Sequence, residues 1–288
     1  MDPRLLDFYS QDGEHERRRL QTGRGRLELL RTQELLRRAL PPPPATVADV
    51  GGGPGTYAAW LAAAGYDVRL LDVVPALVEQ ARAVAAGQPD RPFTAEVGEA
   101  RSLPWPDESV DAVLLLGPLY HLPDLDDRER ALAEARRVLR PGGVLAAAAI
   151  GRFAALLDAL RARLLDDDLL AYLEGSVLCD GRLEPRDAGF TSAYCHAPEW
   201  LHAEVAAAGF ADTTVLAVEG PGWLLFERED GVPEGAGAAP DDEPLLAAAL
   251  RAARATESEP ALLGASSHLL AVARAPGVGG ASRAGTPS

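Results

Sequence analysis

The sequence contains no lysine, so all 28 of its lysine and arginine positions are arginine. A Schiff-base enzyme and a phosphate loop of the Walker type both need a lysine, and both classes are therefore excluded. Acidic residues outnumber the arginines, 43 against 28, and the formal net charge is −15. Because proteins that bind nucleic acid normally present a basic surface, we expect no nucleic acid partner.

Cysteine is also scarce, with only Cys179 and Cys195 in the chain. Neither a Cys-x-x-Cys nor a His-Glu-x-x-His motif is present, so the sequence predicts no metal site. The two cysteines could pair, but a reducing compartment favours free thiols. No run of about 18 uncharged apolar residues occurs, and the first residues lack the apolar core of a signal peptide. These absences predict a cytoplasmic protein that binds no membrane.

One stretch of the chain carries a nucleotide-binding pattern. Between Thr46 and Asp72, an apolar run leads into glycines at 51, 52, 53 and 55, then a helix-like segment and a second apolar run. This order of strand, glycine turn, helix, strand and acid is typical of a nucleotide-binding half of an open α/β sheet. Glycines let the backbone approach a ligand, the start of a helix offers free N–H groups, and the acid can accept both hydroxyls of a ribose.

The glycine turn distinguishes between nucleotides. A dinucleotide site would read Gly-x-Gly-x-x-Gly, but its third glycine would fall on Thr56. The run from Asp49 to Gly55, Asp-Val-Gly-Gly-Gly-Pro-Gly, instead resembles motif I of the class I S-adenosylmethionine (SAM) dependent methyltransferases. Three further motifs of that family follow: Glu-Ala before Leu-Pro-Trp-Pro at 99–106, Ser-Val-Asp at 109–111 and Arg-Pro-Gly-Gly at 140–143. The resemblance is strong over residues 46 to 150.

The resemblance implies an α/β architecture, the Rossmann-like class I methyltransferase fold. Its sheet would have seven mostly parallel strands with helices on both faces, and the last strand, 268–273, would lie antiparallel at the sheet edge. The predicted parts of the chain are a helical N-terminal lid (1–44), a methyltransferase domain (45–275) with a cap insertion (151–197) and a second insertion (219–267), and a disordered tail (276–288).

The same resemblance implies that SAM is the cofactor. Asp49 would orient the turn and the cofactor's ammonium group, Asp72 would accept the ribose hydroxyls, and Glu99 would lie at the adenine. In full, ten residues are predicted to bind the cofactor: Asp49, Gly51, Gly53, Gly55, Asp72, Val73, Glu99, Ala100, Leu116 and Gly117.

The acceptor should lie beyond the carboxyl end of the fourth strand, because ligands of open α/β sheets bind there. Tyr120 and His121 follow that strand directly. His121 is the candidate general base, which a phenolic acceptor would need, or else a structural histidine. Tyr9 in the lid, Tyr120, and His196 at the end of the cap are candidate substrate contacts, with packing roles as the alternative. The other three histidines are interpreted as surface or packing residues: His15, His202 and His268.

The sequence also resembles the bacterial methyltransferases of specialised metabolism, particularly in Leu-Gly-Pro-Leu-Tyr-His-Leu at 116–122. This resemblance implies a methyltransferase that transfers the methyl group of SAM to oxygen or nitrogen of a small organic molecule, a specialised metabolite. A homodimer is compatible with the sequence. Two alternatives stay open. A protein of the same fold could bind SAM without methylating, as a rearrangement catalyst or in a binding role. The other alternative is a nicotinamide-dependent oxidoreductase, against which the missing third glycine and the turn at 141–143 argue.

Overall fold

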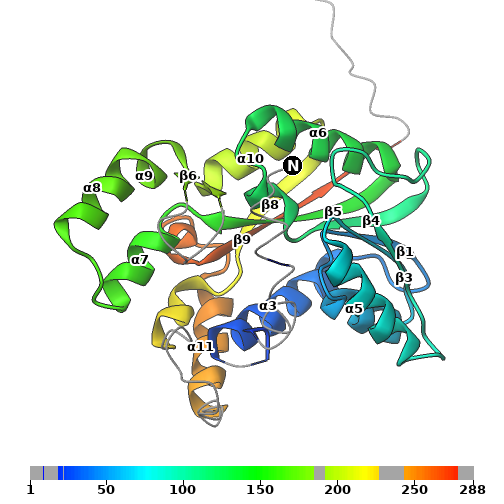
Figure 1. The fold of residues 1–288 in the computed structure, drawn as a ribbon, viewed down its shortest axis with the longest axis horizontal. Coiled ribbons are helices and arrows are strands. Elements are labelled where there is room, and N and C mark those ends of the chain that lie inside the picture. The colour runs from blue at the N-terminus through cyan, green and yellow to red at the C-terminus, as the bar shows by residue number, and fades with distance from the viewer. Residues whose placement is uncertain (1–8, 10–18, 22, 185–191, 227–242, 278–288) are drawn as a thin grey trace, which may run out of the picture.

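The computed structural model describes residues 9, 19–21, 23–184, 192–226 and 243–277, and an open, twisted β-sheet runs through their centre (Figure 1). The main body of the sheet has the order β3 (Thr94–Val97), β2 (Asp67–Asp72), β1 (Thr46–Val50), β4 (Val110–Leu115), β5 (Leu139–Gly151), β9 (His268–Arg274) and β8 (Ala211–Ala217). The first five strands in this order, β3, β2, β1, β4 and β5, are parallel to one another. β9 is antiparallel to both of its neighbours. The predicted α/β fold with a mostly parallel sheet is confirmed.

The last strand is antiparallel, as expected, but it does not lie at the sheet edge. β9 pairs with β5 on one side and with β8 on the other. Most residues of β9 are buried, whereas β8 carries exposed and half-buried residues such as Asp212 and Thr214. A polar strand tolerates the edge, and an apolar strand gains more from two neighbours. The expected position of β9 was therefore wrong.

Two short strands come from the segment that the sequence assigned to a cap. β7 (Ala193–His196) pairs in parallel with Ile150 and Gly151 at the end of β5, and β6 (Arg182–Leu183) pairs antiparallel with β7. This end of β5 extends beyond Ala147, the last residue paired with β4, so its backbone groups are available to β7. The described residues thus form nine strands rather than the seven predicted.

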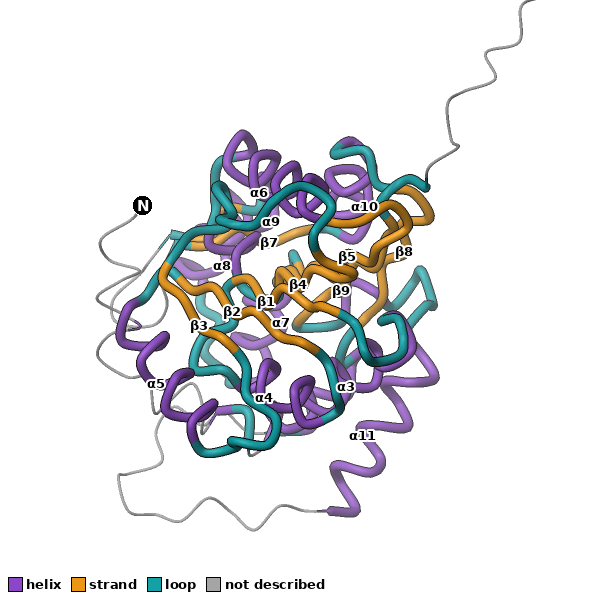
Figure 2. The backbone as a smooth tube through the Cα atoms, turned by 90° about the vertical axis from the view of Figure 1, so that its right-hand side faces the viewer, coloured by secondary structure: helices purple, strands orange, loops and turns teal. Residues whose placement is uncertain are grey.

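Helices cover both faces of the sheet, which Figure 2 shows nearly edge-on. One apolar layer joins α6 and α10 to the sheet, and the other joins α3, α4 and α5 to it. Among the described residues, no helix combines the length and apolar character that crossing a bilayer requires. The helices are α3 (Gly23–Ala39), α4 (Thr56–Ala63), α5 (Pro75–Ala86), α6 (Leu125–Val138), α7 (Ala154–Arg161), α8 (Asp167–Gly175), α9 (Val177–Asp180), α10 (Pro198–Ala207) and α11 (Glu243–Thr256), with 3-10 turns η1 (Pro118–His121), η2 (Gly220–Leu225) and η3 (Leu263–Ala265).

Helix α3, from the predicted lid, is anchored to the predicted second insertion. Leu27 packs with Trp223 and Leu246 in a small apolar cluster. Arg31 has no exposed surface, and it donates to the Val218 carbonyl at 3.1 Å and to Glu257 at 2.6 Å. Most of the lid before residue 23, and residues 278–288 of the predicted disordered tail, lie outside the described residues.

Candidate cofactor and acceptor site

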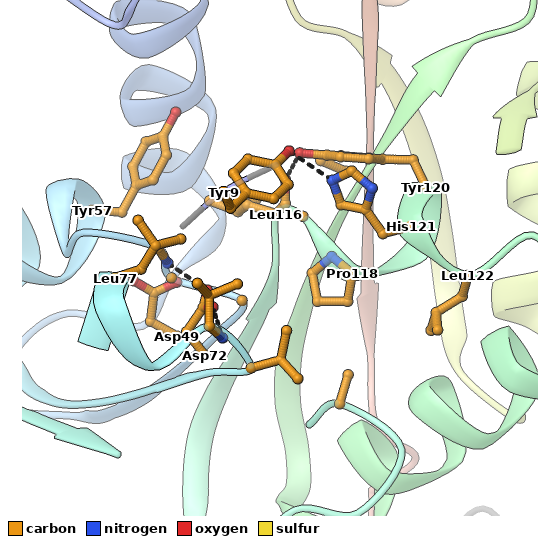
Figure 3. A pocket seen from close by; sticks show the side chains of 18 of the residues that line it. Tyr9, Asp49, Tyr57, Asp72, Leu77, Leu116, Pro118, Tyr120, His121 and Leu122 are labelled. Atoms are coloured by element: carbon orange, nitrogen blue, oxygen red, sulfur yellow. Dashed lines mark hydrogen bonds between the residues drawn. The ribbon is translucent and has the colours of Figure 1, made fainter. Parts of the chain in front are cut away.

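A cavity of about 390 Å³ lies at the carboxyl ends of β1, β2 and β4 (Figure 3). Its size is in the range of small-molecule sites. The start of β9 reaches the same edge, because β9 runs antiparallel to these strands. Twelve of the fourteen predicted site residues line the cavity: Tyr9, Asp49, Gly51, Gly53, Asp72, Val73, Glu99, Ala100, Leu116, Gly117, Tyr120 and His121.

The glycine turn after β1 brings the backbone to the cavity. Gly51 and Gly53 have φ of +71° and +55°, conformations that side chains rarely adopt. The Gly51 amide donates to the Leu71 carbonyl at 2.7 Å, and a Cβ on Gly51 would lie only 2.7 Å from the Pro118 ring. A Cβ on Gly53 would meet nothing within 4 Å. Gly51 therefore allows the close approach of η1, and Gly53 faces open space.

Gly55 does not contact the cavity, contrary to the prediction. It is buried with φ of +87° immediately before α4, and a Cβ there would lie 2.9 Å from the Phe93 ring. Its neighbours Gly52 and Pro54 line the cavity instead. The alternating glycines of the motif predicted a cavity contact at every second position. Gly55 is an exception, because the turn directs it toward Phe93 and toward Ala81 of α5.

Asp72 connects the glycine turn to the next helix. Its Oδ2 accepts from the Gly53 amide at 2.8 Å and its Oδ1 from the Val74 amide at 2.9 Å (Figure 3). Burial raises the pKa of Asp72, and the hydrogen bonds from backbone amides oppose this shift. Each carboxylate oxygen can accept a second hydrogen bond, so Asp72 can hold the turn and still accept from a ligand.

Asp49, at the base of the cavity, has an unsatisfied carboxylate. Only 1% of the residue is exposed, and neither carboxylate oxygen has a well-formed hydrogen bond among the described residues. Burial and then the charge of Asp72 raise the pKa of Asp49 to about 7, while the Ala58 backbone opposes the shift. A buried acid without a partner is costly, and a cationic ligand group beside it would offset that cost.

The predicted adenine end carries an ion-pair chain that the sequence reading missed. Arg101 bonds to Glu99 at 2.6 Å and to Asp127 at 2.7 Å, and all three residues line the cavity. One carboxylate oxygen of Glu99 is therefore already engaged. Asp127 lies in α6, so this chain fixes the loop after β3 against that helix.

Three aromatic rings meet at the opposite wall. The Tyr9 hydroxyl lies 2.8 Å from Nε2 of His121, and the Tyr120 ring stacks edge-on against His121 with 4.7 Å between centroids (Figure 3). The Tyr120 hydroxyl donates to the Leu116 carbonyl at 3.1 Å. Burial lowers the pKa of His121 to about 4, although a backbone hydrogen bond with Ser192 opposes the shift. His121 is therefore neutral at neutral pH, and its Nε2 is engaged by Tyr9.

Acid should destabilise the protein partly through His121. A pKa lowered from 6.5 to about 4 means that the unfolded chain binds a proton more readily. The contribution of the neutral His121 ring to the free energy of unfolding is therefore fully present above about pH 6.5, and it is lost as the pH falls toward 4. Between about pH 7.5 and pH 5 the loss should be about 2 kcal/mol smaller in His121→Gln than in the unchanged protein. Urea unfolding at the two pH values measures it, and equal losses in both proteins would contradict the assignment.

His196 lies outside the cavity, so its predicted contact with the acceptor is wrong for this site. It is fully buried in β7, with Nε2 3.2 Å from the Glu204 carboxylate. Glu204 also receives two hydrogen bonds of 2.8 Å from Arg128, whose guanidinium lies 3.7 Å above the Tyr194 ring. Arg128 donates to two carbonyls just after η1. His196 thus belongs to a cluster that supports the loop carrying His121.

Beyond Arg101 and Asp127, several further polar residues of the cavity wall were not anticipated. Among them, Glu28 and Thr32 come from α3, Tyr57 from α4 and His268 from the start of β9. The interpretation of His268 as a surface or packing residue was wrong. A signal was present, because the first residue of an antiparallel strand lies at the carboxyl edge of its parallel neighbours, where ligands bind.

The comparison with known families agrees with this geometry. Residues 48–147 match the family described as a methyltransferase domain. Residues 48–147 therefore form a methyltransferase domain of the class I SAM-dependent type. A curated relative, 27-O-demethylrifamycin SV methyltransferase of Amycolatopsis mediterranei, is 33% identical over 186 residues, which make up 59% of this chain and 65% of the relative. The matched regions span 41% to 65% of the first curated relatives, so their activities are not transferred whole.

Solved structures share the fold of this chain. A SAM-dependent methyltransferase of Methanosarcina mazei aligns over 84% of this chain and 97% of its own, with a TM-score of 0.56 and 18% identity. The [4+2]-cyclase SpnF aligns over 87% of this chain and 82% of its own, with a TM-score of 0.54 and 20% identity. At these identities the likeness shows the fold alone.

SAM is the cofactor of this family, and the described residues fit it. The unsatisfied carboxylate of Asp49 suits the cofactor's ammonium group. The open space beside Gly53 lets a ligand approach the turn. Asp72 retains free acceptor capacity where a ribose would lie.

Proposed function

We propose that this methyltransferase transfers the methyl group of SAM to oxygen or nitrogen of a small organic molecule, a specialised metabolite. The observation that carries the proposal is one continuous cavity with the unpartnered Asp49 and the Asp72 turn at one end and aromatic and titratable side chains at the other. The relative named for 27-O-demethylrifamycin SV supports a small acceptor. The homodimer, the cytoplasmic location and the absence of a nucleic acid partner stay predictions.

The cofactor end of the cavity has defined roles in this proposal. Asp72 accepts hydrogen bonds from the ribose, Asp49 balances the ammonium group, and Glu99 with the Ala100 amide holds the adenine. Leu116 and Gly117 form the floor where β4 ends. When bound, SAM supplies an activated methyl group that is transferred by in-line displacement. The chain's main contribution is alignment of the acceptor, which can account for much of the rate.

The aromatic wall would close over the acceptor. Tyr9 comes from the predicted lid, and its hydrogen bond with His121 joins that segment to the turn after β4. Tyr120 is fixed by its bond to the Leu116 carbonyl, so its ring forms a wall of constant position. The role of His121 as a general base stays a prediction, and its engagement with Tyr9 supports a role in closing the cavity.

A second candidate function keeps the cofactor but transfers no methyl group. The fold is compatible with this function, because the [4+2]-cyclase SpnF shares it. In that case the cavity would hold a single reacting molecule, and S-adenosylhomocysteine would not form.

Calorimetric titration with SAM, S-adenosylhomocysteine and NADH tests the proposal first. We expect the first two to bind and NADH to fail, because the turn lacks the third glycine of a dinucleotide site. Mass spectrometry then follows S-adenosylhomocysteine and the methylated product, with 27-O-demethylrifamycin SV as the first probe. Binding of a probe without formation of S-adenosylhomocysteine would favour the non-methylating function, and binding of NADH alone would contradict both.

A further inference from the structure

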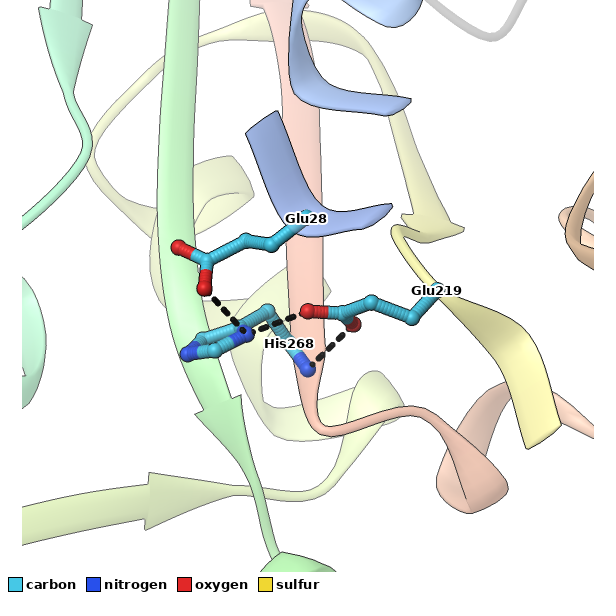
Figure 4. Close-up of side chains that lie close together, drawn as sticks. All are labelled: Glu28, Glu219 and His268. Carbon is cyan, nitrogen blue, oxygen red and sulfur yellow. Dashed lines mark hydrogen bonds and ion pairs between the residues drawn. The ribbon is translucent and has the colours of Figure 1, made fainter. Parts of the chain in front are cut away.

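Beyond the aromatic wall, a half-buried histidine and two glutamates meet at the cavity. His268 opens β9, Glu219 follows β8 and Glu28 belongs to α3 (Figure 4). Nδ1 of His268 lies 2.6 Å from Oε1 of Glu219 and 3.9 Å from Oε2 of Glu28. Three segments far apart in the sequence thus place one imidazole between two carboxylates.

Glu219 is held in place on every side. Its Oε2 accepts from the Ser266 hydroxyl at 2.9 Å and from the His268 amide at 3.0 Å. The Ser266 hydroxyl in turn accepts from the amides of Glu219 and Gly220, each at 3.1 Å. A carboxylate with this many donors cannot turn, so its bond to Nδ1 sets the orientation of the His268 ring.

The arrangement leaves Nε2 of His268 as the acceptor nitrogen. A carboxylate only accepts, so the proton of the neutral ring lies on Nδ1 and the lone pair on Nε2. Within the described part of the chain, no hydrogen bond to Nε2 is present, and Figure 4 shows this nitrogen turned away from Glu219. The His268 side chain is 21% exposed and lines the cavity, against 2% for Glu219.

The surrounding charges favour the protonated ring. Arg19 bonds to both oxygens of Glu28, and although burial opposes ionisation, the charges of Arg19 and His268 lower the pKa of Glu28 to about 2. Burial also disfavours a charged His268, but Glu28 and Glu219 outweigh it and raise the pKa of His268 above its usual value. His121, in contrast, has its pKa lowered to about 4. Of the two cavity histidines, His268 is the stronger base.

A metal ion is a less suitable occupant of this cluster. The donor atoms of the three residues lie within 4.8 Å of one another, which is close enough for a common ion. However, the Nδ1 to Oε1 separation of 2.6 Å is that of a shared proton, and Arg19 already binds Glu28. The two carboxylates are therefore already engaged by His268 and Arg19, and the cluster suits a proton better than a metal ion.

We propose that His268, oriented by Glu219, accepts the proton of a hydroxyl group on the acceptor, so that this enzyme methylates oxygen. The inference rests on the proposed methyl transfer. As the acceptor oxygen forms its bond to the methyl carbon, its proton passes to Nε2, and the electron pair of the broken carbon–sulfur bond stays on sulfur. Glu219 and Glu28 stabilise the imidazolium until it returns the proton to water. Glu219 is a positioning residue, and Glu28 acts through its charge.

Histidine NMR on the full chain tests the network without an acceptor. We expect the His268 ring, identified by the signals missing in His268→Gln, to carry its proton on Nδ1 and to titrate above about pH 6.5. Glu219→Gln should lower the pKa of His268 by about one unit or more. Glu28→Gln should lower that pKa less, because the carboxylate of Glu219 stays bonded to the ring. A proton on Nε2, a pKa below the usual value, or displacement of the ring proton by equimolar Zn²⁺ would overturn the proposal.

Kinetics with 27-O-demethylrifamycin SV and with catechol test the catalytic step. His268→Gln should slow formation of S-adenosylhomocysteine by about 10²- to 10⁴-fold near pH 7, with less loss at higher pH and little change in SAM affinity. His202→Gln, on the exposed face of α10, is the matched control. An unchanged rate in His268→Gln, or a product methylated on nitrogen, would overturn the role of His268. Failure to bind SAM would instead contradict the proposed function, and the NMR result would still stand.

Discussion

Replacing Asp72 by alanine should weaken SAM binding by about 1–3 kcal/mol, or roughly 5- to 150-fold in Kd. The expected loss has two sources. The variant removes the acceptor that we propose for the ribose, and it also removes the hydrogen bonds that Asp72 receives from Gly53 and Val74. The glycine turn would then no longer be held against the start of α5. Calorimetric titration with SAM and with S-adenosylhomocysteine measures the change.

Asp67→Ala provides the matched control. Asp67 is the first residue of the same strand, its side chain is 65% exposed, and it does not line the cavity. Removing the same carboxylate there should leave SAM affinity unchanged, and urea unfolding shows whether both variants remain folded. Equal affinities for the Asp72 variant and the unchanged protein would remove Asp72 from the cofactor site.

Arg31→Ala should lower the free energy of unfolding by about 3–5 kcal/mol. Arg31 is a fully buried residue of α3, and its side chain contacts Glu34, Glu257 just after α11 and the Val218 carbonyl. Its removal leaves the Val218 carbonyl and Oε2 of Glu257 without this donor, while Arg38 still reaches Glu257 and Arg254 still reaches Glu34. It also opens a cavity where the buried side chain lay. Urea unfolding of the full chain measures the loss.

Arg38→Ala is the matched control, because it removes an arginine that pairs with the same glutamate but is not buried. Arg38 bonds to the same Glu257 at 2.8 Å, but its side chain is 48% exposed. Exposed pairs contribute little, so this variant should lose at most about 1 kcal/mol. Similar losses in both variants would mean that the position of α3 does not depend on the buried arginine.

Much of the fold could be predicted because its signals are local. The apolar runs that become β1, β2 and β4 are short and continuous, as buried parallel strands require. The glycines at 51 and 53 adopt φ values that other residues avoid, so the turn is encoded where it forms. Asp72 follows from the same logic, since the tip of the second strand always lies beside the turn in this topology.

The wrong predictions depended on pairing between distant segments. β9 enters between β5 and β8, and β7 joins the end of β5, because exposed backbone groups were available there. The periodicity of a strand indicates that it has a buried face, but not which neighbour buries it. Gly55 shows the same limit within a motif, because its direction depends on the packing of Phe93.

The sequence by itself determined the α/β class, the cofactor family and the wall of the cavity that one continuous segment supplies, from Asp49 to Asp72. These depend on residue type and short spacing. Only the tertiary structure decided that Tyr9 meets His121, that His196 is buried away from the cavity, and that Glu28, Glu219 and His268 form one network. The physical reason is that contacts between residues about fifty to more than two hundred positions apart arise from the packing of the whole sheet and its helices. Local patterns encode elements and turns, but not which distant side chains meet.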